Sequence, residues 1–364
     1  MPGSTISFVP RSQGPFQNPG SLWQFSNDNM LHTLRSHWLA AATALLTAAL
    51  PAWSQTQEVT FAYQDMLVPL RTVIESGELE KTTGYKITWR QFGGGGDVIR
   101  AMASGDVQIG EAGSSPIAAA ASQGQDIRLF WILDDIADAE ALVARQGSGI
   151  HGWKDLKGKK VATPFVSTSH YQLLAGLKEA GVPARDVNIV NLRPPEIAAA
   201  WERGDIDAAF IWDPALAKAK ASGGQVIATS GSLGQKGYAT FDGLVVNAQW
   251  AAQHEAFVVA LVKAVAAADA RYRKDGAHWT ADTPEVKAIA KWSKADPKDV
   301  PAAIALYRFP TVQEQVSAQW LGGNAAKALA RTAVFLKEQG RVQEVKPDYG
   351  TFVTPVYAQK ALGR

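Results

Sequence analysis

Residues 98–108 read VIRAMASGDVQ and residues 197–207 read IAAAWERGDID, and the two stretches agree in residue type at most positions. Each predicts a helix that ends at a Gly-Asp turn and is followed by a short strand. A polar loop then runs to Pro116 in the first copy and to Pro214 in the second. The repetition predicts two related lobes, with chance similarity of two α/β units as the alternative.

Strands and helices alternate on both sides of this repeat. The stretch before it predicts a strand at 58–63, a helix at 68–81 and a strand at 86–92, and the alternation continues to about residue 247. Such alternation is typical of α/β proteins with parallel sheets. Beyond residue 249 the pattern predicts helices, at 251–272, 284–294, 312–321 and 325–338.

The order of these elements predicts a two-lobe clamshell whose chain crosses between the lobes twice. Residues 55–143 and 244–364 are expected to form lobe 1, and residues 144–243 lobe 2. Loops at the carboxyl ends of equivalent strands would then face each other across a cleft, where open α/β sheets bind ligands.

Composition excludes several classes of protein. The chain has 364 residues, 36 Lys+Arg against 34 Asp+Glu, and no Cys. A formal net charge of +2 gives no broad basic surface for nucleic acid. The absence of Cys excludes disulfides, thiolate metal sites, Cys nucleophiles and a lipid-modified Cys.

The N-terminal region predicts export. Within residues 30–54, a basic start precedes an apolar run at 38–50 and the small residues Ala52 and Ser54. This pattern is typical of a cleaved secretory signal peptide and is too short to span a bilayer, although a buried helix is an alternative. Residues 1–29 form a further N-terminal extension without periodicity. The expected product is an unanchored protein outside the cytoplasm.

Two predicted helix starts carry hydroxyl residues. Ser115 and Pro116 suit the N-cap and first position of a helix, and Thr168 and Ser169 stand at a second start. Free N–H groups at such starts bind anions, whereas ordinary capping would explain one Ser alone. Neutral donors suffice for an anion that is ionised at every relevant pH, which favours a sulfonate, sulfate or nitrate over a multiply charged phosphate. The Gly run at 93–96 predicts a flexible turn rather than a phosphate loop.

Acidic and aromatic residues lie near the same loops. An acid at the cleft could hold a ligand ammonium, whereas most acids on such loops are solvated or cap helices. The acidic candidates are Glu111, Glu140, Asp213 and Asp242. Aromatic residues at strand ends are candidates for the pocket wall or for the core. These are Tyr63, Phe165, Tyr171 and Trp212.

No arrangement of residues predicts catalysis. Ser169 and His170 are adjacent, but a catalytic triad is defined by spatial geometry rather than by adjacency. The remaining His residues lack metal-ligand spacing, and we find no cofactor lysine. The sequence therefore predicts a protein that is not an enzyme and has neither metal nor cofactor.

Several segments together resemble one family. They are Tyr63-Gln64, 100–110, 113–116, 164–171 and 194–201. Their order and spacing are similar to those of the taurine-binding proteins of ABC importers, in the sulfonate/nitrate/taurine substrate-binding family. The resemblance implies a type II periplasmic binding fold and a periplasmic monomer that delivers taurine to a membrane permease. Other alkyl- or aminosulfonates are the alternative ligands, and an exported enzyme on the same fold is a less favoured alternative.

The resemblance also implies roles for individual residues. The sulfonate would be held by Ser114, Ser115, Thr168, Ser169 and His170, and the ammonium by Asp242. Glu111 and Asp213 depart from some relatives, which predicts a more acidic pocket. The full set expected at the ligand adds Tyr63, Gln64, Trp212 and Glu140 to these residues.

Overall fold

The computed structural model describes residues 57–363, which belong to one compact unit, Thr56–Arg364. The predicted extension and signal peptide at residues 1–54 lie outside the described residues. Among residues 57–363, no helix combines the length and apolar character that crossing a bilayer requires.

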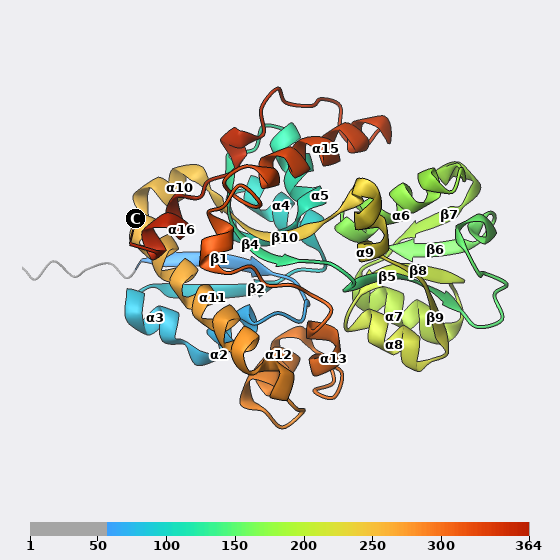
Figure 1. Cartoon of the computed structure of the whole chain (residues 1–364), viewed down its shortest axis with the longest axis horizontal. Coiled ribbons are helices and arrows are strands. Elements are labelled where there is room, and N and C mark those ends of the chain that lie inside the picture. Colours follow the sequence, from blue (N-terminus) through green and yellow to red (C-terminus); the bar gives the residue numbers. More distant parts are fainter. Residues whose placement is uncertain (1–56, 364) are drawn as a thin grey trace, which may run out of the picture. The chain divides into compact units, whose positions relative to one another are not determined.

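The described residues form two five-stranded sheets (Figure 1). The first sheet has the order β2 (Lys86–Gln91), β1 (Glu58–Tyr63), β3 (Ile109–Gly113), β10 (Phe241–Asn247), β4 (Ile127–Asp135). The second has the order β7 (Asn188–Asn191), β6 (Lys160–Thr163), β8 (Ala208–Trp212), β5 (Glu140–Arg145), β9 (Gly224–Thr229). The predicted α/β fold with two lobes is confirmed.

The two sheets share one topology. Each contains four strands from one continuous part of the chain, in the spatial order second, first, third and fourth, and one strand from outside that part is inserted between the third and the fourth. In each sheet the inserted strand, β10 or β5, runs antiparallel to both neighbours, while the other pairs are parallel. The repeated units form equivalent pairs, α4 (Gly95–Ala103) with β3 and α7 (Pro194–Arg203) with β8. The sheets are therefore mixed, with one reversed strand each, rather than purely parallel.

The inserted strands mark where the chain crosses between lobes. β4 ends at Asp135 and β5 begins at Glu140, so the first crossover is residues 136–139. The second ends where β10 begins, at Phe241. The chain therefore passes from one sheet to the other a few residues before the expected lobe boundaries at 143/144 and 243/244. The reason is that β5 already pairs in the second sheet and β10 already pairs in the first.

Helices cover the sheets. They are α2 (Leu70–Ser76), α3 (Glu78–Thr83), α5 (Ser114–Ser122), α6 (Thr168–Glu179), α8 (Ala215–Ala221), α9 (Ser230–Leu233), α10 (Ala248–Gln253), α11 (Glu255–Asp275), α12 (Pro284–Ser293), α13 (Val300–Ile304), α14 (Val312–Gln315), α15 (Asn324–Glu338) and α16 (Val356–Ala361). The single helix predicted at 68–81 is wrong, because Gly77 adopts a left-handed conformation with φ 60° and divides it into α2 and α3. The predicted helix 312–321 is reduced to the four residues of α14.

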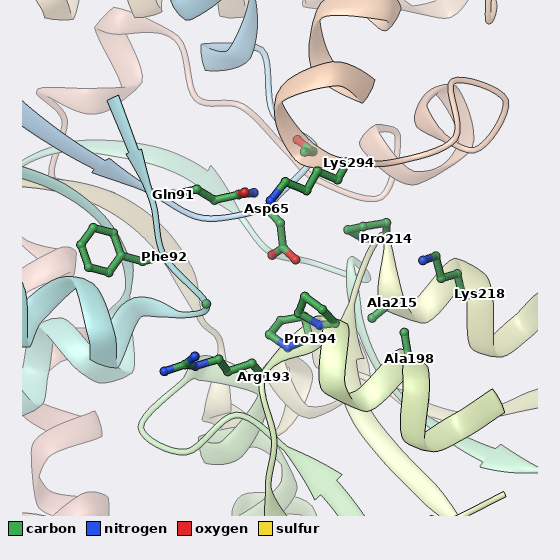
Figure 2. Close-up of a pocket in the computed structure, with 13 residues that line it drawn as sticks. Asp65, Gln91, Phe92, Arg193, Pro194, Ala198, Pro214, Ala215, Lys218 and Lys294 are labelled. Carbon is green, nitrogen blue, oxygen red and sulfur yellow. The ribbon is translucent and has the colours of Figure 1, made fainter. Parts of the chain in front are cut away.

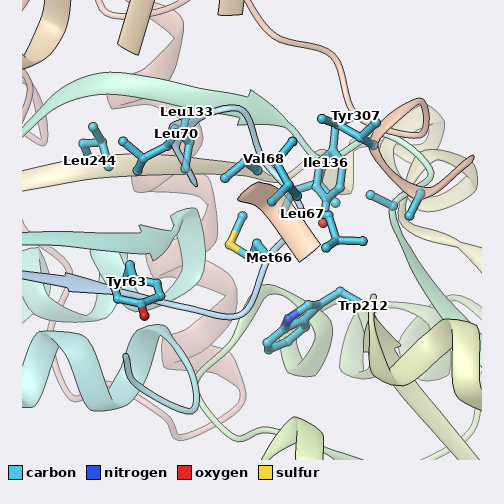
Figure 3. Packing of buried hydrophobic residues seen from close by; sticks show 14 of the residues in the cluster. Tyr63, Met66, Leu67, Val68, Leu70, Leu133, Ile136, Trp212, Leu244 and Tyr307 are labelled. Atoms are coloured by element: carbon cyan, nitrogen blue, oxygen red, sulfur yellow. The ribbon is translucent and has the colours of Figure 1, made fainter. Parts of the chain in front are cut away.

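One hydrophobic cluster connects the two lobes. It contains residues of the first sheet such as Leu133 and Leu244, and it continues through Met66 and Ile136 to Trp212 of the second sheet (Figure 3). This continuous core fixes the strand ends of both sheets beside each other. The loops that follow those strands form the candidate site.

Candidate functional site

A small cavity lies where the carboxyl ends of strands from both sheets meet. Its lining residues are Gln64, Met66, Gly95, Gly113, Pro116, Glu140, Ser167, Thr168, Trp212, Asp242 and Tyr307. The cavity volume is about 10 Å³, which is close to the minimum for one water molecule. The space between these strand ends is therefore almost filled by side chains.

The starts of α5 and α6 meet at Gly113. A Cβ atom at position 113 would lie 2.6 Å from Thr168 Cγ2 and 3.1 Å from Asp242 Oδ1, so only glycine fits there. Gly113 itself is the N-cap of α5, and its position makes the prediction of Ser115 as the N-cap wrong. This contact joins lobe 1 to lobe 2 at the cavity wall.

Buried hydroxyl groups without partners lie at these two helix starts. The Oγ atoms of Ser115 and Ser169 are both buried and make no hydrogen bond with normal geometry. Ser114 differs, because its Oγ accepts a hydrogen bond from Phe241 N at 3.4 Å. A buried polar group without a partner is costly unless a ligand satisfies it. Ser115 thus has an unused donor for an anion, whereas the Ser169 hydroxyl lies close enough to Glu140 to lower the pKa of that carboxyl group.

The start of α6 is held by its own hydrogen bonds. Ser167 caps the helix by accepting from His170 N at 3.0 Å, and Val166 before it has a positive φ of 60°. The ring of His170 stacks on Phe165 with centroids 4.5 Å apart, and its Nε2 atom is buried without a partner. Burial, followed by the Arg341 charge, lowers the pKa of His170 to about 3. His170 is therefore neutral at physiological pH, which leaves an N–H group free to donate.

The acid Glu111 is fully occupied by Arg71. Arg71 donates from Nη1 and Nη2 to the two oxygens of Glu111, each at 2.8 Å, and both side chains are completely buried. Gln64 N also donates to Glu111 Oε1 at 3.1 Å. This clasp ties the loop after β1 to β3, and Glu111 is not among the residues that line the cavity. Its charge is balanced within the protein.

Asp242 and Glu140 reach the cavity without a cationic partner. Burial, and then the Glu140 charge, raises the pKa of Asp242 well above its usual range. Glu140 accepts from Thr168 Oγ1 at 2.5 Å and from Ser230 Oγ at 3.3 Å. Burial raises the pKa of Glu140 to about 7 in spite of these hydrogen bonds. The cavity lining thus contains carboxyl groups that lack a positive charge. The expected residues Ser114, Ser115, Ser169 and His170 stand at the two helix starts beside the cavity and are not part of its lining.

This geometry is accompanied by a clear relationship to known proteins. Residues 81–277 match the NMT1/THI5-like family. The chain is also 40% identical over 306 residues to the taurine-binding periplasmic protein of Escherichia coli K12, covering 84% of this chain and 94% of the relative. The chain belongs to the NMT1/THI5-like family.

Solved structures share the fold of this NMT1/THI5-like protein. The alkanesulfonate-binding protein SsuA from Xanthomonas axonopodis pv. citri, bound to MOPS, superposes with a TM-score of 0.69 at 24% identity, covering 83% of this chain and 99% of that one. The desulfurization enzyme DszB superposes with a TM-score of 0.58 at 18% identity, covering 85% and 99%. The fold therefore occurs in both a binding protein and an enzyme, and function must be argued from the site.

The remaining expected residues take supporting positions in this NMT1/THI5-like protein. Trp212 lines the cavity and donates from Nε1 to Asp65 Oδ1 at 2.9 Å, which joins the two lobes. Asp213 accepts from Ala217 N at 2.7 Å and so holds the start of α8. Tyr63 lies beneath Arg71, whose guanidinium carbon is 5.0 Å from the ring centroid. Asp213 and Tyr63 lie outside the cavity lining.

Figure 2 shows a second, larger cavity, which Asp65 helps to line. It has a volume of about 350 Å³ and is lined by residues of both lobes, among them Arg193, Lys218 and Lys294. None of the residues expected at the ligand lines it. It shares no lining residue with the small cavity, and the hydrogen bond from Trp212 to Asp65 joins one residue of each lining.

Several residues that line the cavity were not among those expected at the ligand: Met66, Gly95, Gly113, Pro116, Ser167 and Tyr307. Asp134 lies beside Asp242 and was not expected either. Asp134 could have been noticed as an acid at the end of the apolar stretch 127–133. Tyr307 follows α13, far along the chain, and no local pattern connects it to the cleft.

Proposed function

We propose that this protein is a periplasmic solute-binding protein that captures taurine and delivers it to the permease of an ABC importer. One observation carries the proposal: buried hydroxyl groups without hydrogen-bond partners lie at the two helix starts beside a cavity between the lobes, and carboxyl groups without a cation line that cavity. Taurine has a sulfonate for the first set and an ammonium for the second. The 40% identity to a taurine-binding periplasmic protein supports the same ligand.

The sulfonate would lie between the starts of α5 and α6. Ser115, Ser169 and His170 stand at these two starts with buried polar atoms that lack partners, and since none of them lines the closed cavity, opening of the lobes would have to expose them to the ligand. The two helix N-termini add free N–H groups and a favourable dipole. A sulfonate stays ionised at physiological pH, so neutral donors suffice.

The ammonium would lie against Asp242, with Glu140 nearby. Each hydrogen bond to a charged group contributes about 1.5–3 kcal/mol net. Four or five of them, after the costs of ordering and association, give micromolar affinity or better. A sulfonate without an ammonium leaves the Asp242 carboxylate desolvated and unpaired, so the site discriminates against it.

Ligand entry would require the lobes to separate. The cavity of about 10 Å³ accommodates no more than about one water, whereas taurine has several heavy atoms. The two crossovers, one of which is residues 136–139, are the segments about which the lobes would open. Closure on the ligand would then produce the form that the permease recognises.

The proposal extends to what the protein does with its ligand and where it acts. A binding protein returns taurine unchanged, so incubation with taurine should give no new signal by NMR, and turnover would contradict this assignment. We propose that the chain is a monomer exported by a cleaved signal peptide and not attached to lipid.

Thermal unfolding with a panel of solutes tests the ligand. A ligand that binds only the folded state raises the melting temperature. We expect a clear rise with taurine, a smaller one with ethanesulfonate, and none with sulfate, nitrate or glycine betaine. A rise with ethanesulfonate but not with taurine would favour alkylsulfonate import and remove Asp242 from the site. No rise with either sulfonate would reject the proposal.

A further inference from the structure

Asp134 forms a carboxyl pair with Asp242. The two residues are register partners on the antiparallel strands β4 and β10, and their side chains interact. Asp134 is completely buried, and neither of its carboxyl oxygens accepts a hydrogen bond from an N–H group or a hydroxyl. Asp242 lines the cavity, whereas Asp134 is not part of the lining. Asp134 therefore acts on the ligand only through Asp242.

Other charged groups around the pair do not neutralise it. From β3, Glu111 is occupied by Arg71 of α2, and from β5, Glu140 adds a further carboxyl group. Asp135, the neighbour of Asp134 on β4, pairs with Arg308 at 3.6 Å. The remaining titratable group that faces the pair is the phenol of Tyr307. Among the described residues, no Lys, Arg or His forms an ion pair with Asp134 or Asp242.

Two adjacent buried carboxyl groups cannot both be ionised without a cation, so one of them holds a proton. Burial, followed by the Asp242 charge, raises the pKa of Asp134 well above its usual range. The proton belongs on Asp134, because no N–H or hydroxyl group donates a hydrogen bond to its oxygens. Burying a negative charge on Asp134 would therefore cost more free energy than burying it on Asp242. Asp242 faces the cavity and is also stabilised as an anion by the Arg71 charge.

We propose that Asp134 is a neutral carboxylic acid that donates its O–H to Asp242 and so fixes a single negative charge at the cavity wall. Asp134 is thereby a positioning residue that matches the site to ligands with one ammonium group. This inference rests on the proposed function, because the ammonium of taurine is the group that the charge would receive.

Two substitutions at Asp134 test the inference by calorimetry with taurine and ethanesulfonate. In Asp134→Asn the amide replaces the O–H donor, so we expect taurine affinity within about threefold of the wild type. In Asp134→Ala the donor is lost and Asp242 protonates more easily, so taurine affinity should fall by about tenfold or more at pH 7. Ethanesulfonate has no ammonium, and its affinity should change by less than about twofold in both variants.

The pH dependence separates this role from a merely structural one. In Asp134→Ala, a higher pH ionises Asp242 again, so the taurine deficit should shrink as pH rises. Infrared spectra of the unliganded wild type should contain a protonated carboxylic acid band that Asp134→Asn removes. Because burial also raises the pKa of Glu140, the matched control Glu140→Gln should retain the Asp134 band.

Three results would overturn the inference: equal losses for both ligands in Asp134→Ala, an equal taurine loss in Asp134→Asn and Asp134→Ala, or a deficit that does not change with pH. Wild-type protein that binds no taurine would instead contradict the proposed function. The two failures are therefore distinguishable, since the inference is tested on variants of a wild type that binds.

Discussion

The two lobes have the same strand order but place their hydroxyl and carboxyl groups at different positions in it. In lobe 1 the loop after the third strand, β3, starts α5 with Ser114 and Ser115, whereas in lobe 2 the loop after the equivalent β8 contains Asp213 and Pro214. The hydroxyl groups of lobe 2 come from a different place, the start of α6 after its first strand, β6. Lobe 1 also carries the carboxyl pair of Asp134 and Asp242.

This difference follows from the ligand that we propose. A repeated fold can present two symmetric loops, but taurine has a negative end and a positive end. Equivalent loops must then differ, so that the two ends of the ligand meet different groups. The repeat provides the two walls of the cleft, and the departures from the repeat provide the recognition.

The largest effect is expected on the stability of lobe 1, at the buried ion pair between Arg71 and Glu111. Arg71→Met leaves Glu111 buried without its partner, which should lower the free energy of unfolding by about 3–5 kcal/mol. Chemical denaturation measures this loss. Arg100→Met, on an exposed side chain of α4, is the matched control and should change stability little. Equal effects of the two substitutions would show that the clasp has no special role.

The carboxyl group that lobe 2 contributes should make stability depend on pH. The pKa of Glu140 is about 7 in the folded protein against 4.5 for an unperturbed Glu. Between these values the folded state binds more protons than the unfolded state, so stability falls as pH rises from about 4.5 to 7 and is level above that range. The unliganded wild type should lose about 3 kcal/mol relative to Glu140→Gln across this range. Glu344→Gln, at an exposed position, should show no such difference from the wild type.

The acid of lobe 1 should determine which ligands bind. Asp242→Asn removes the partner of the ammonium, so taurine should bind about 2–3 kcal/mol more weakly, which is roughly 30- to 150-fold. Ethanesulfonate should lose much less. Calorimetry with both ligands checks this, and equal losses would remove Asp242 from the ammonium site.

The hydroxyl groups of the two lobes should contribute about equally. Ser115→Ala in lobe 1 and Ser169→Ala in lobe 2 should each weaken taurine and ethanesulfonate alike, by about 1.5 kcal/mol or roughly tenfold. Ser115→Ala should not destabilise the unliganded protein, because its hydroxyl lacks a partner there, whereas Ser169→Ala also removes a hydroxyl that lies beside Glu140. Ser222→Ala, at an exposed serine, is the control. A loss of affinity in only one variant would mean that one lobe alone holds the sulfonate.

The smallest effect is expected at the edge of the cleft. Lys178 of α6 and Glu338 of α15 form an exposed ion pair between the lobes at 2.8 Å. Exposed pairs contribute about 0–1 kcal/mol, so Lys178→Ala should change taurine affinity by less than about fivefold. A larger change would indicate that peripheral contacts control closure as strongly as the central ones.

Local patterns in the sequence predicted most elements correctly. Glu58–Tyr63 alternates and is β-branched, which is why β1 could be placed at its observed bounds. Strand direction was not predictable in the same way, because the side-chain pattern of β5 or β10 is the same whichever way the strand runs. The reversal of these strands therefore appears only when pairing partners are known.

Pairing at long range limited the prediction of the site. The expected acid Glu111 could not be recognised as internally balanced, since Arg71 lies 40 residues away in the sequence. The unpartnered state of the Ser115 and Ser169 hydroxyl groups likewise depends on what packs around them. The sequence indicated which loops face the cleft, and three-dimensional packing decides which of their side chains remain available.

The exchange of strands between the lobes also governs the order in which this protein can be assembled. β10 lies between β3 and β4 in the first sheet but follows all of lobe 2 along the chain. A fragment that ends before Phe241 lacks both the strand that joins β3 to β4 and the acid Asp242 on it. A chain that is made from its N-terminus can therefore complete the sheet of lobe 2 first, while the sheet of lobe 1 still lacks the strand between β3 and β4. The recognition site comes into existence only when this late strand is inserted.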